Sequence, residues 1–191
     1  MNFLQIIGYS LLVVNFVFMV INILGIRLTT KVKIAISILL VLLANGIPVF
    51  NHLPLVALMN GCFSDLSITT IIILGAVFFD NSQDKVILLP KIFPMPVQLT
   101  ILFFGIMLYI SVIGILKLDI YDLGYQPTYL LYGFCLLELL FLYTNKWFAI
   151  IWFLALVGFY FNFQNSTNFW DYLFDPFLWV FAILINLRRC K

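Results

Sequence analysis

The sequence has little charge for its length. Aspartate, glutamate, lysine and arginine make up 9% of its 191 residues, whereas hydrophobic residues make up 64% and aromatic residues 18%. Soluble domains contain about 25% charged residues, which cover the surface around the buried core. A chain with so few charges cannot cover its apolar surface in water, so the composition predicts a membrane protein.

Residues that build metal sites and disulfides are also scarce. The chain has one histidine, His52, and three cysteines, Cys62, Cys135 and Cys190, with no CxxC spacing. Neither zinc nor a disulfide is indicated. Glycine-rich phosphate loops, GxSxG and HExxH are absent from the sequence as well. We therefore expect no cofactor and no metal, and an enzyme is the less favoured interpretation.

The distribution of charge limits the partners. The net charge is +2, and the ten lysines and arginines are scattered without forming a basic stripe, so no nucleic-acid partner is indicated. The polar breaks between the apolar stretches are too short for an extramembrane domain. The expected partners are the lipid bilayer and either other membrane polypeptides or further copies of this chain.

Seven apolar stretches are long enough, or nearly so, for helices that cross about 30 Å of hydrocarbon. They are 3–24, 33–50, 54–79, 98–116, 128–144, 147–163 and 169–187. A helix that began at Pro176 would be too short to span, so we expect the last helix to begin near Asn168 and to kink at Asp175. The predicted fold is all-α, a single transmembrane helical domain over residues 1–191.

Positive charge decides the predicted orientation, because cytoplasmic loops carry the excess of lysine and arginine. If the stretch 54–79 crosses the membrane, nine basic residues lie on one side and Lys117 lies alone on the other. The nine are Arg27, Lys31, Lys33, Lys85, Lys91, Lys146, Arg188, Arg189 and Lys191. If that stretch instead dips in and returns at Asn60–Gly61, the split becomes four to six. The sequence favours seven crossings, with the N-terminus outside and the C-terminus in the cytoplasm.

Polar residues interrupt the third stretch. Asn60, Ser64, Asp65 and Ser67 lie between apolar runs and share one broad side of a helix at about 100° per residue. Asp65 is expected near the centre of the bilayer, where a carboxylate is costly. The polar side should face protein or a water-filled cavity, and the Asn60–Gly61 pair is a place where the helix can break.

Glu138 is a second acid inside an apolar run, in the string "LLELL". An ionised carboxylate among leucines is strongly disfavoured, so Glu138 is either protonated or paired with a partner on another helix or another polypeptide. The predicted spans offer only neutral partners, namely Asn15 and Asn22 on the first and Ser37 and Asn45 on the second. Hydrogen bonds from such residues can also serve only to hold helices together.

Acidic and aromatic residues recur just before two of the later spans. The strings "KLDIYDLGYQP" and "FWDYLFDP" contain Asp119, Asp122, Asp171 and Asp175 beside tyrosine and tryptophan. One interpretation is an interfacial belt, in which rings anchor the chain and aspartates begin helices. The other is an acidic vestibule on the outer face that concentrates cations, together with His52.

Three functions fit these features. The first is a small membrane-embedded subunit or carrier that supports movement of protons, cations or a small solute through Asp65 and Glu138. The second is a non-catalytic membrane partner in a larger complex. The third and least favoured is an intramembrane enzyme that acts on a lipid-linked substrate with Asp65, His52 and the outer acids. Small size and the lack of targeting features favour a bacterial inner membrane as the location.

Overall fold

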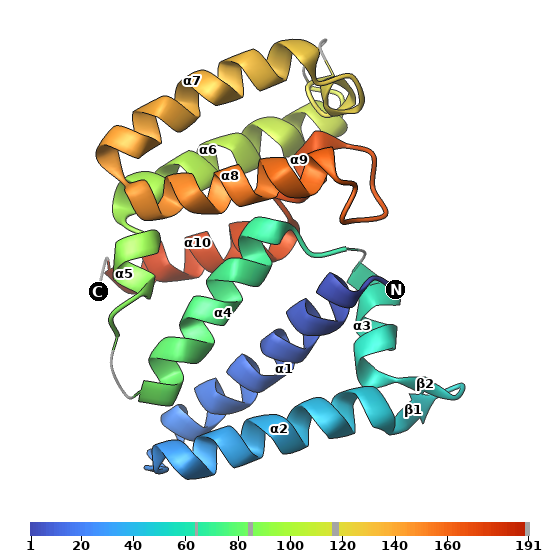
Figure 1. Ribbon diagram of the computed structural model, residues 1–191, viewed down its shortest axis with the longest axis vertical. Coiled ribbons are helices and arrows are strands. Elements are labelled where there is room, and N and C mark those ends of the chain that lie inside the picture. The colour runs from blue at the N-terminus through green and yellow to red at the C-terminus, as the bar shows by residue number, and fades with distance from the viewer. Residues whose placement is uncertain (64, 84–85, 116–118, 190–191) are drawn as a thin grey trace. The chain divides into compact units, whose positions relative to one another are not determined.

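The protein is described by a computed structural model that covers residues 1–63, 65–83, 86–115 and 119–189. These residues form an all-helical fold, as predicted from the sequence, with 76% helix in ten α-helices (Figure 1). The helices are α1 Phe3–Ile23, α2 Thr30–Gly46, α3 Leu55–Phe63, α4 Ile68–Gln83, α5 Leu89–Ile92, α6 Met95–Val112, α7 Thr128–Thr144, α8 Lys146–Tyr160, α9 Phe169–Leu173 and α10 Pro176–Arg189. A short 3-10 helix, η1, covers Asp122–Tyr125.

The chain forms two compact units. Unit 1 contains Met1–Leu66 and Ile71–Pro90, and unit 2 contains Ser67–Thr70 and the chain from Lys91 onward. The first turn of α4 therefore belongs to unit 2, while the rest of that helix belongs to unit 1.

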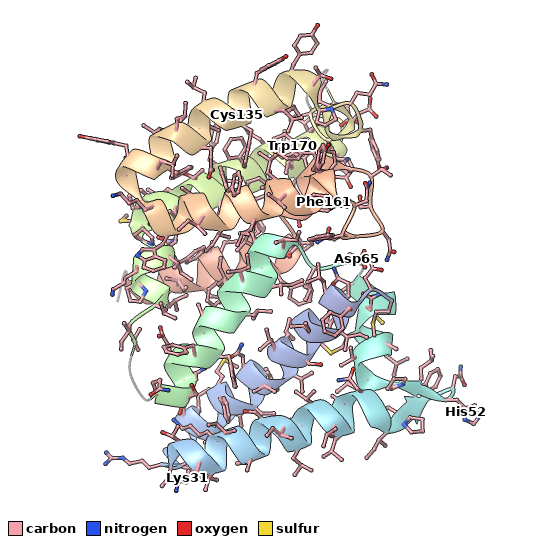
Figure 2. All side chains as sticks on the ribbon, viewed as in Figure 1. Lys31, His52, Asp65, Cys135, Phe161 and Trp170 are labelled. Atoms are coloured by element: carbon pink, nitrogen blue, oxygen red, sulfur yellow. The ribbon has the colours of Figure 1, made fainter. Side chains whose placement is uncertain are left out.

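In unit 1, α1 and α2 pack against each other, and α3 packs against both. A β-hairpin joins α2 to α3; its strands, β1 Pro48–Phe50 and β2 Leu53–Pro54, pair antiparallel. Asn51 and His52 form its two-residue turn with φ values of 47° and 62°. Such a turn needs left-handed backbone at both positions, because only that twist matches the paired strands. His52 therefore lies at the exposed tip of the hairpin (Figure 2).

The expectation of one continuous helix over 54–79 is wrong. Helix α3 ends at Phe63, and α4 begins only at Ile68. The side chain of Gln5 on α1 holds the backbone of Leu66 in this break: its Nε2 donates to the Leu66 carbonyl at 3.0 Å, and the Leu66 amide donates to its Oε1 at 2.7 Å. A buried backbone must find hydrogen bonds somewhere, and the Gln5 amide replaces those that a continuous helix would have supplied.

Polar contacts bring the start of α2 to the end of α4 within unit 1. The buried Lys33 donates from Nζ to the Asn81 carbonyl at 2.7 Å. Asn81 in turn donates to Asn15 Oδ1 at 3.4 Å, and Asn15 donates to the Leu74 carbonyl at 2.9 Å. A cation at the C-terminal end of a helix is favourable, because the last carbonyls carry partial negative charge. The start of α2 and the end of α4 therefore lie at the same end of unit 1.

In unit 2, α7 packs against α8 and α6 packs against α10 (Figure 1). Asn145 lies between α7 and α8; its Oδ1 accepts from the Phe148 amide at 3.2 Å, and its Nδ2 donates to the Lys91 carbonyl at 3.0 Å. Asn145 thus caps α8 and holds the α7–α8 turn beside the end of α5.

The predicted form of the last span is also wrong. Helix α9 ends at Leu173, and α10 begins at Pro176, so Pro176 does not lie inside a kinked helix. Proline suits the first position of a helix, because its missing N–H is not needed there. Asp175 precedes it and accepts from the Leu178 amide through Oδ1 at 2.7 Å, as a helix-capping residue does.

Among the described residues, two helices are long and apolar enough to cross a membrane by length and composition, α1 and α6. Helices α4, α7 and α8 and the segment Pro176–Asn186 of α10 are apolar but shorter.

Candidate functional site

Two helix starts share the carboxylate of Asp175. The Ser67 amide, just before α4, donates to Asp175 Oδ2 at 2.7 Å, while the Leu178 amide in the first turn of α10 donates to Oδ1. The Ser67 hydroxyl bonds to Thr70 Oγ1 at 3.0 Å and accepts from the Thr70 amide at 3.1 Å. The first amides of a helix lack partners inside that helix, so one acid here serves two helices.

The surroundings of Asp175 have opposing effects on the pKa of its carboxyl. Burial raises the pKa of the Asp175 carboxyl above its ordinary value of 3.8, and hydrogen bonds from Thr70, Leu178 and Ser67 offset part of that rise. The residue as a whole keeps some exposure, whereas its carboxylate is enclosed by these donors. These contacts are hydrogen-bond donors to a carboxylate, and they hold the backbone break in place.

The structure places the polar residues of the third stretch on different elements. Asn60 lies on α3, Asp65 in the connection between α3 and α4 (Figure 2), and Ser67 directly before α4. Ser64 lies outside the described residues. Asp65 is therefore not part of a helix, contrary to the expectation of a mid-helix acid. Ser67 meets Asp175, which the sequence had placed with the outer acids.

The asparagines of the first two helices make their bonds within unit 1. Asn15 bonds to Leu74 and Asn81, as described above. Asn45 donates to Ser10 Oγ and to the Val41 carbonyl, both at 2.9 Å. Asn22 is exposed near the end of α1. Pairing of any of these residues with Glu138 stays a prediction.

Three of the four outer aspartates accept hydrogen bonds that organise loops of unit 2. Asp119 accepts from the Ser111 hydroxyl at 3.3 Å and from the Asp122 amide at 3.0 Å. Asp171 accepts from Tyr121 at 2.9 Å and from Ser166. These contacts favour the interpretation in which the aspartates organise loops and helix starts. An acidic surface open to cations would leave the carboxylates free of such contacts. The vestibule that these acids and His52 would form stays a prediction.

The segment around η1 is locked to the segment around α9. Asn168 Nδ2 donates to the Tyr121 carbonyl at 3.0 Å, and Trp170 Nε1 donates to the Ile120 carbonyl at 2.9 Å. Gly124 lies so close that a Cβ there would be 1.9 Å from Asn168 Oδ1. Burial, followed by the charge of Asp171, raises the pKa of the Tyr121 phenol. The phenol therefore stays a hydrogen-bond donor to Asp171.

Glu138 lies on the buried stripe of α7. The buried residues of that helix are Phe134, Glu138 and Phe141, which follow one another at the spacing of one helix face. Glu138 is 9% exposed, and its Oε2 has no hydrogen-bond partner among the described residues. A buried polar atom without a partner is uncommon in folded proteins and calls for an explanation.

An indole lies against the same stripe. Trp152 on α8 is fully buried, and its ring centre is 4.7 Å from that of Phe134 and 5.1 Å from that of Phe141. Because Phe134 and Phe141 precede and follow Glu138 along α7, Trp152 lies at the level of Glu138. Trp152 Nε1 also has no hydrogen-bond partner in the described part of the chain.

Sequence reasoning missed Gln5, Trp152 and Lys33 as residues of interest. Gln5 lies near the start of the first apolar stretch, where a polar residue is ordinarily interfacial. Lys33 entered the sequence argument only in the count of positive charges on each side of the membrane. Glu138 lies seven residues before Asn145, and Trp152 lies seven residues after it. Two helices joined by a tight turn at Asn145 bring residues at equal distances from the turn to the same level, so this spacing could have predicted that Glu138 and Trp152 are neighbours.

The arrangement offers no metal centre that we can assign. In the described ranges, no group of three or more His, Cys, Asp or Glu side chains gathers that could hold a metal ion. Cys62 and Cys135 are exposed free thiols. No protein-family model matches the sequence, and no curated protein or solved structure matches it either. A functional proposal therefore depends on the chemistry of the chain itself.

Proposed function

We propose that the chain is an integral membrane protein with seven crossings, formed by α1, α2, α4, α6, α7, α8 and α10. Support comes from the distribution of polarity: many large apolar side chains are exposed, and several polar side chains are buried. Buried polar side chains include Gln5, Ser37, Gln98 and Glu138. A soluble chain would place such groups in water and cover its surface with charge.

The exposed residues of helix α7 support this proposal most directly. Leu136 and Leu139 are exposed in its middle, and Tyr129 and Tyr143 are 88% and 90% exposed near its two ends. Tyrosine is enriched where a helix passes the headgroup region, and leucine where it passes the hydrocarbon. Tyr129 and Tyr143 are about 21 Å apart along the helix at 1.5 Å per residue. Short spans of this kind are accommodated by local thinning of the bilayer.

Contacts between loops support the proposed orientation, N-terminus outside and C-terminus in the cytoplasm. Lys33 at the start of α2 contacts Asn81 near the end of α4 in unit 1. In unit 2, Lys91 contacts Asn145, the neighbour of Lys146. Each unit thus has an end that carries several of its basic residues, which is the arrangement expected for the cytoplasmic side.

Labelling of single cysteines in sealed cells tests the orientation. In a chain without its native cysteines, Asp122→Cys should react with a membrane-impermeant maleimide from outside. Lys146→Cys should react only after the membrane is opened, and Lys91→Cys serves as a second inner position. Labelling of Lys146→Cys in intact cells would disprove the seven-crossing proposal.

For activity, we propose a membrane-embedded subunit or carrier that supports movement of protons, cations or a small solute in a bacterial inner membrane. One observation carries this proposal: Glu138 is buried in an apolar helix with an unpartnered Oε2. Acids inside a bilayer are costly and commonly belong to ion or proton pathways. Because Asp65 lies in the break between α3 and α4, Glu138 is the better-supported of the two acids.

Reconstitution tests the proposed activity. The purified chain in liposomes should carry a flux that depends on pH, read with an internal pH dye, and Glu138→Gln should abolish it. Cys135→Ser on the same helix is the control, because Cys135 is exposed and its replacement should leave the flux unchanged. A flux that survives in Glu138→Gln would exclude Glu138 as the carrying group.

The second candidate is a non-catalytic partner in a larger membrane complex. The exposed apolar face of α7 favours it, since that face could contact another polypeptide as well as lipid. Purification separates the two proposals: an obligate partner should be unstable or aggregated alone and monodisperse with its neighbour. A lone, monodisperse and active chain would exclude the second candidate.

A further inference from the structure

The interior of unit 2 brings an acid and an indole together at one level of the α7–α8 hairpin. Glu138 lies seven residues before Asn145 and Trp152 lies seven residues after it. At 1.5 Å per residue, each is about 10 Å from the turn. The Trp152 ring contacts Phe134 and Phe141, which precede and follow Glu138 on the buried stripe of α7, so the indole and the acid lie at the same level.

Apolar groups enclose this pair. The Phe148 ring centre lies 4.7 Å from that of Trp152, and the rings of Phe104 and Phe174 lie at 6.5 Å and 5.8 Å. In this medium an unbonded polar atom is costly, because no solvent compensates it.

Few charged or titratable groups face the acid. Lys146, the charged residue of α8, lies six residues before Trp152, about 9 Å along the helix. On α7, Tyr132 and Cys135 are exposed rather than on the buried stripe. The aromatic side chains that α6 and α8 contribute around Trp152 do not titrate.

The two unpartnered atoms define what can bind. Trp152 Nε1 is only a donor, so its partner must have a lone pair. Glu138 Oε2 accepts when the carboxyl is ionised and can donate when it is protonated. A bare metal or alkali cation has no lone pair to accept from the indole. A water molecule satisfies both groups, because an oxygen lone pair accepts from the indole and an O–H group donates to the carboxylate.

We propose that Glu138 and Trp152 form a proton-binding site, which takes up a proton through a water molecule held between the carboxyl oxygen and the indole N–H. This inference rests on the proposed function and narrows it from protons, cations or solutes to protons. In protonation, the water donates one proton to the Glu138 carboxylate and accepts one from hydronium of the aqueous phase. The carboxyl becomes neutral, and the bound water remains neutral. The indole stays protonated throughout and acts as a positioning group.

Indole NMR on the intact chain tests the site directly. With ¹⁵N-labelled tryptophan in nanodiscs, the four Nε1–H signals can be observed, and the Trp152 signal is identified by its loss in Trp152→Phe. We expect that signal to shift with pH along a single titration curve and to show cross-relaxation with water. Trp147, which is exposed on the same helix, is the internal control.

Variants at Glu138 decide the interpretation. Glu138→Gln should abolish the pH-dependent shift of the Trp152 signal, and Glu138→Asp should keep a titration with a moved midpoint. The other three indole signals report whether each variant is folded. Addition of sodium or potassium at constant pH should leave the Trp152 signal unchanged.

Two results would overturn the proposal: a Trp152 signal that does not titrate in the folded wild-type chain, or one that responds to sodium or potassium. Its failure differs from failure of the carrier proposal. A flat titration with intact flux in liposomes would overturn the proton site alone, whereas a titration without any flux would overturn the carrier alone.

Discussion

The backbone amide of Ser67 donates to Oδ2 of Asp175 at 2.7 Å, across 108 positions of the chain. This bond explains how the third apolar stretch can be interrupted. The break exposes backbone groups of Leu66 and Ser67, and Gln5 satisfies the first while Asp175 satisfies the second. Buried backbone that is not helical is tolerated only when protein groups or water satisfy its hydrogen bonds.

Asp175→Ala should destabilise the protein strongly. The change leaves the amides of Ser67 and Leu178 without their acceptor, and each unsatisfied buried donor costs about 1–3 kcal/mol. Chemical unfolding in detergent micelles measures the loss. Asp122→Ala is the control, because an exposed residue should change the free energy of unfolding by less than about 0.5 kcal/mol. Equal effects of the two substitutions would show that Asp175 does not support the break.

The stability should also depend on the ionisation of Asp175. Burial raises the pKa of its carboxyl in the folded state above the ordinary value of 3.8. The folded state therefore holds this proton more tightly than the unfolded state does. The resulting stabilisation is complete below pH 3.8 and is lost as the pH rises through the folded-state pKa.

Unfolding at a series of pH values measures this contribution as the difference between wild type and Asp175→Asn. The stability of wild type relative to the variant should fall as the pH rises above 3.8. A difference that instead grows with pH would mean that the hydrogen bonds from Ser67, Thr70 and Leu178 outweigh burial.

Close packing of α6 on α10 predicts a contrast between two glycines. A Cβ at Gly105 would lie 2.1 Å from Cδ1 of Trp179, whereas a Cβ at Gly133 on α7 meets nothing within 4 Å. Gly105→Ala should therefore destabilise by about 1–3 kcal/mol through overpacking. Gly133→Ala should be neutral or stabilising by up to about 1 kcal/mol, since alanine favours a helix. Thermal unfolding of both variants gives the comparison, and a stable Gly105→Ala variant would contradict the close contact.

Tyr121→Phe should loosen the contact between the segments around η1 and α9. The change removes the hydroxyl that donates to Asp171, at a cost of about 1 kcal/mol. Because burial and Asp171 raise the pKa of the Tyr121 phenol, the variant should also lose the tyrosinate absorbance that develops at the highest pH. Tyr129→Phe, at an exposed position, should change neither the stability nor that part of the titration.

Local pattern was enough to locate most helices. The stretch 128–144 coincides with α7, and 3–24 differs from α1 by one residue, because a long apolar run between polar breaks has few alternatives to a helix. The errors lie at interruptions and at one helix end: the stretch 54–79 became α3 and α4, 169–187 became α9 and α10, and the end of 33–50 became strand β1. Each interruption is held by contacts with residues distant in the chain, which periodicity cannot reveal.

The sequence predicted one residue of the candidate site, Glu138, and missed the other, Trp152. Glu138 stands out in the sequence, since an acid among leucines is costly wherever it lies in a helix. Its neighbour Trp152 does not stand out, because tryptophan is ordinary in an apolar helix. Asp175 and Ser67 were both singled out but assigned to different places, since only the folded chain shows that they touch.

By itself, the sequence determined the all-α fold class and the location of the apolar segments, because these follow from local composition and hydrophobic pattern. Tertiary structure alone decided where two of those segments break and which side chains complete them. Gln5 and Leu66 are 61 positions apart, and Ser67 and Asp175 are 108. Hydrogen bonds over such separations depend on how helices pack, which no local pattern encodes.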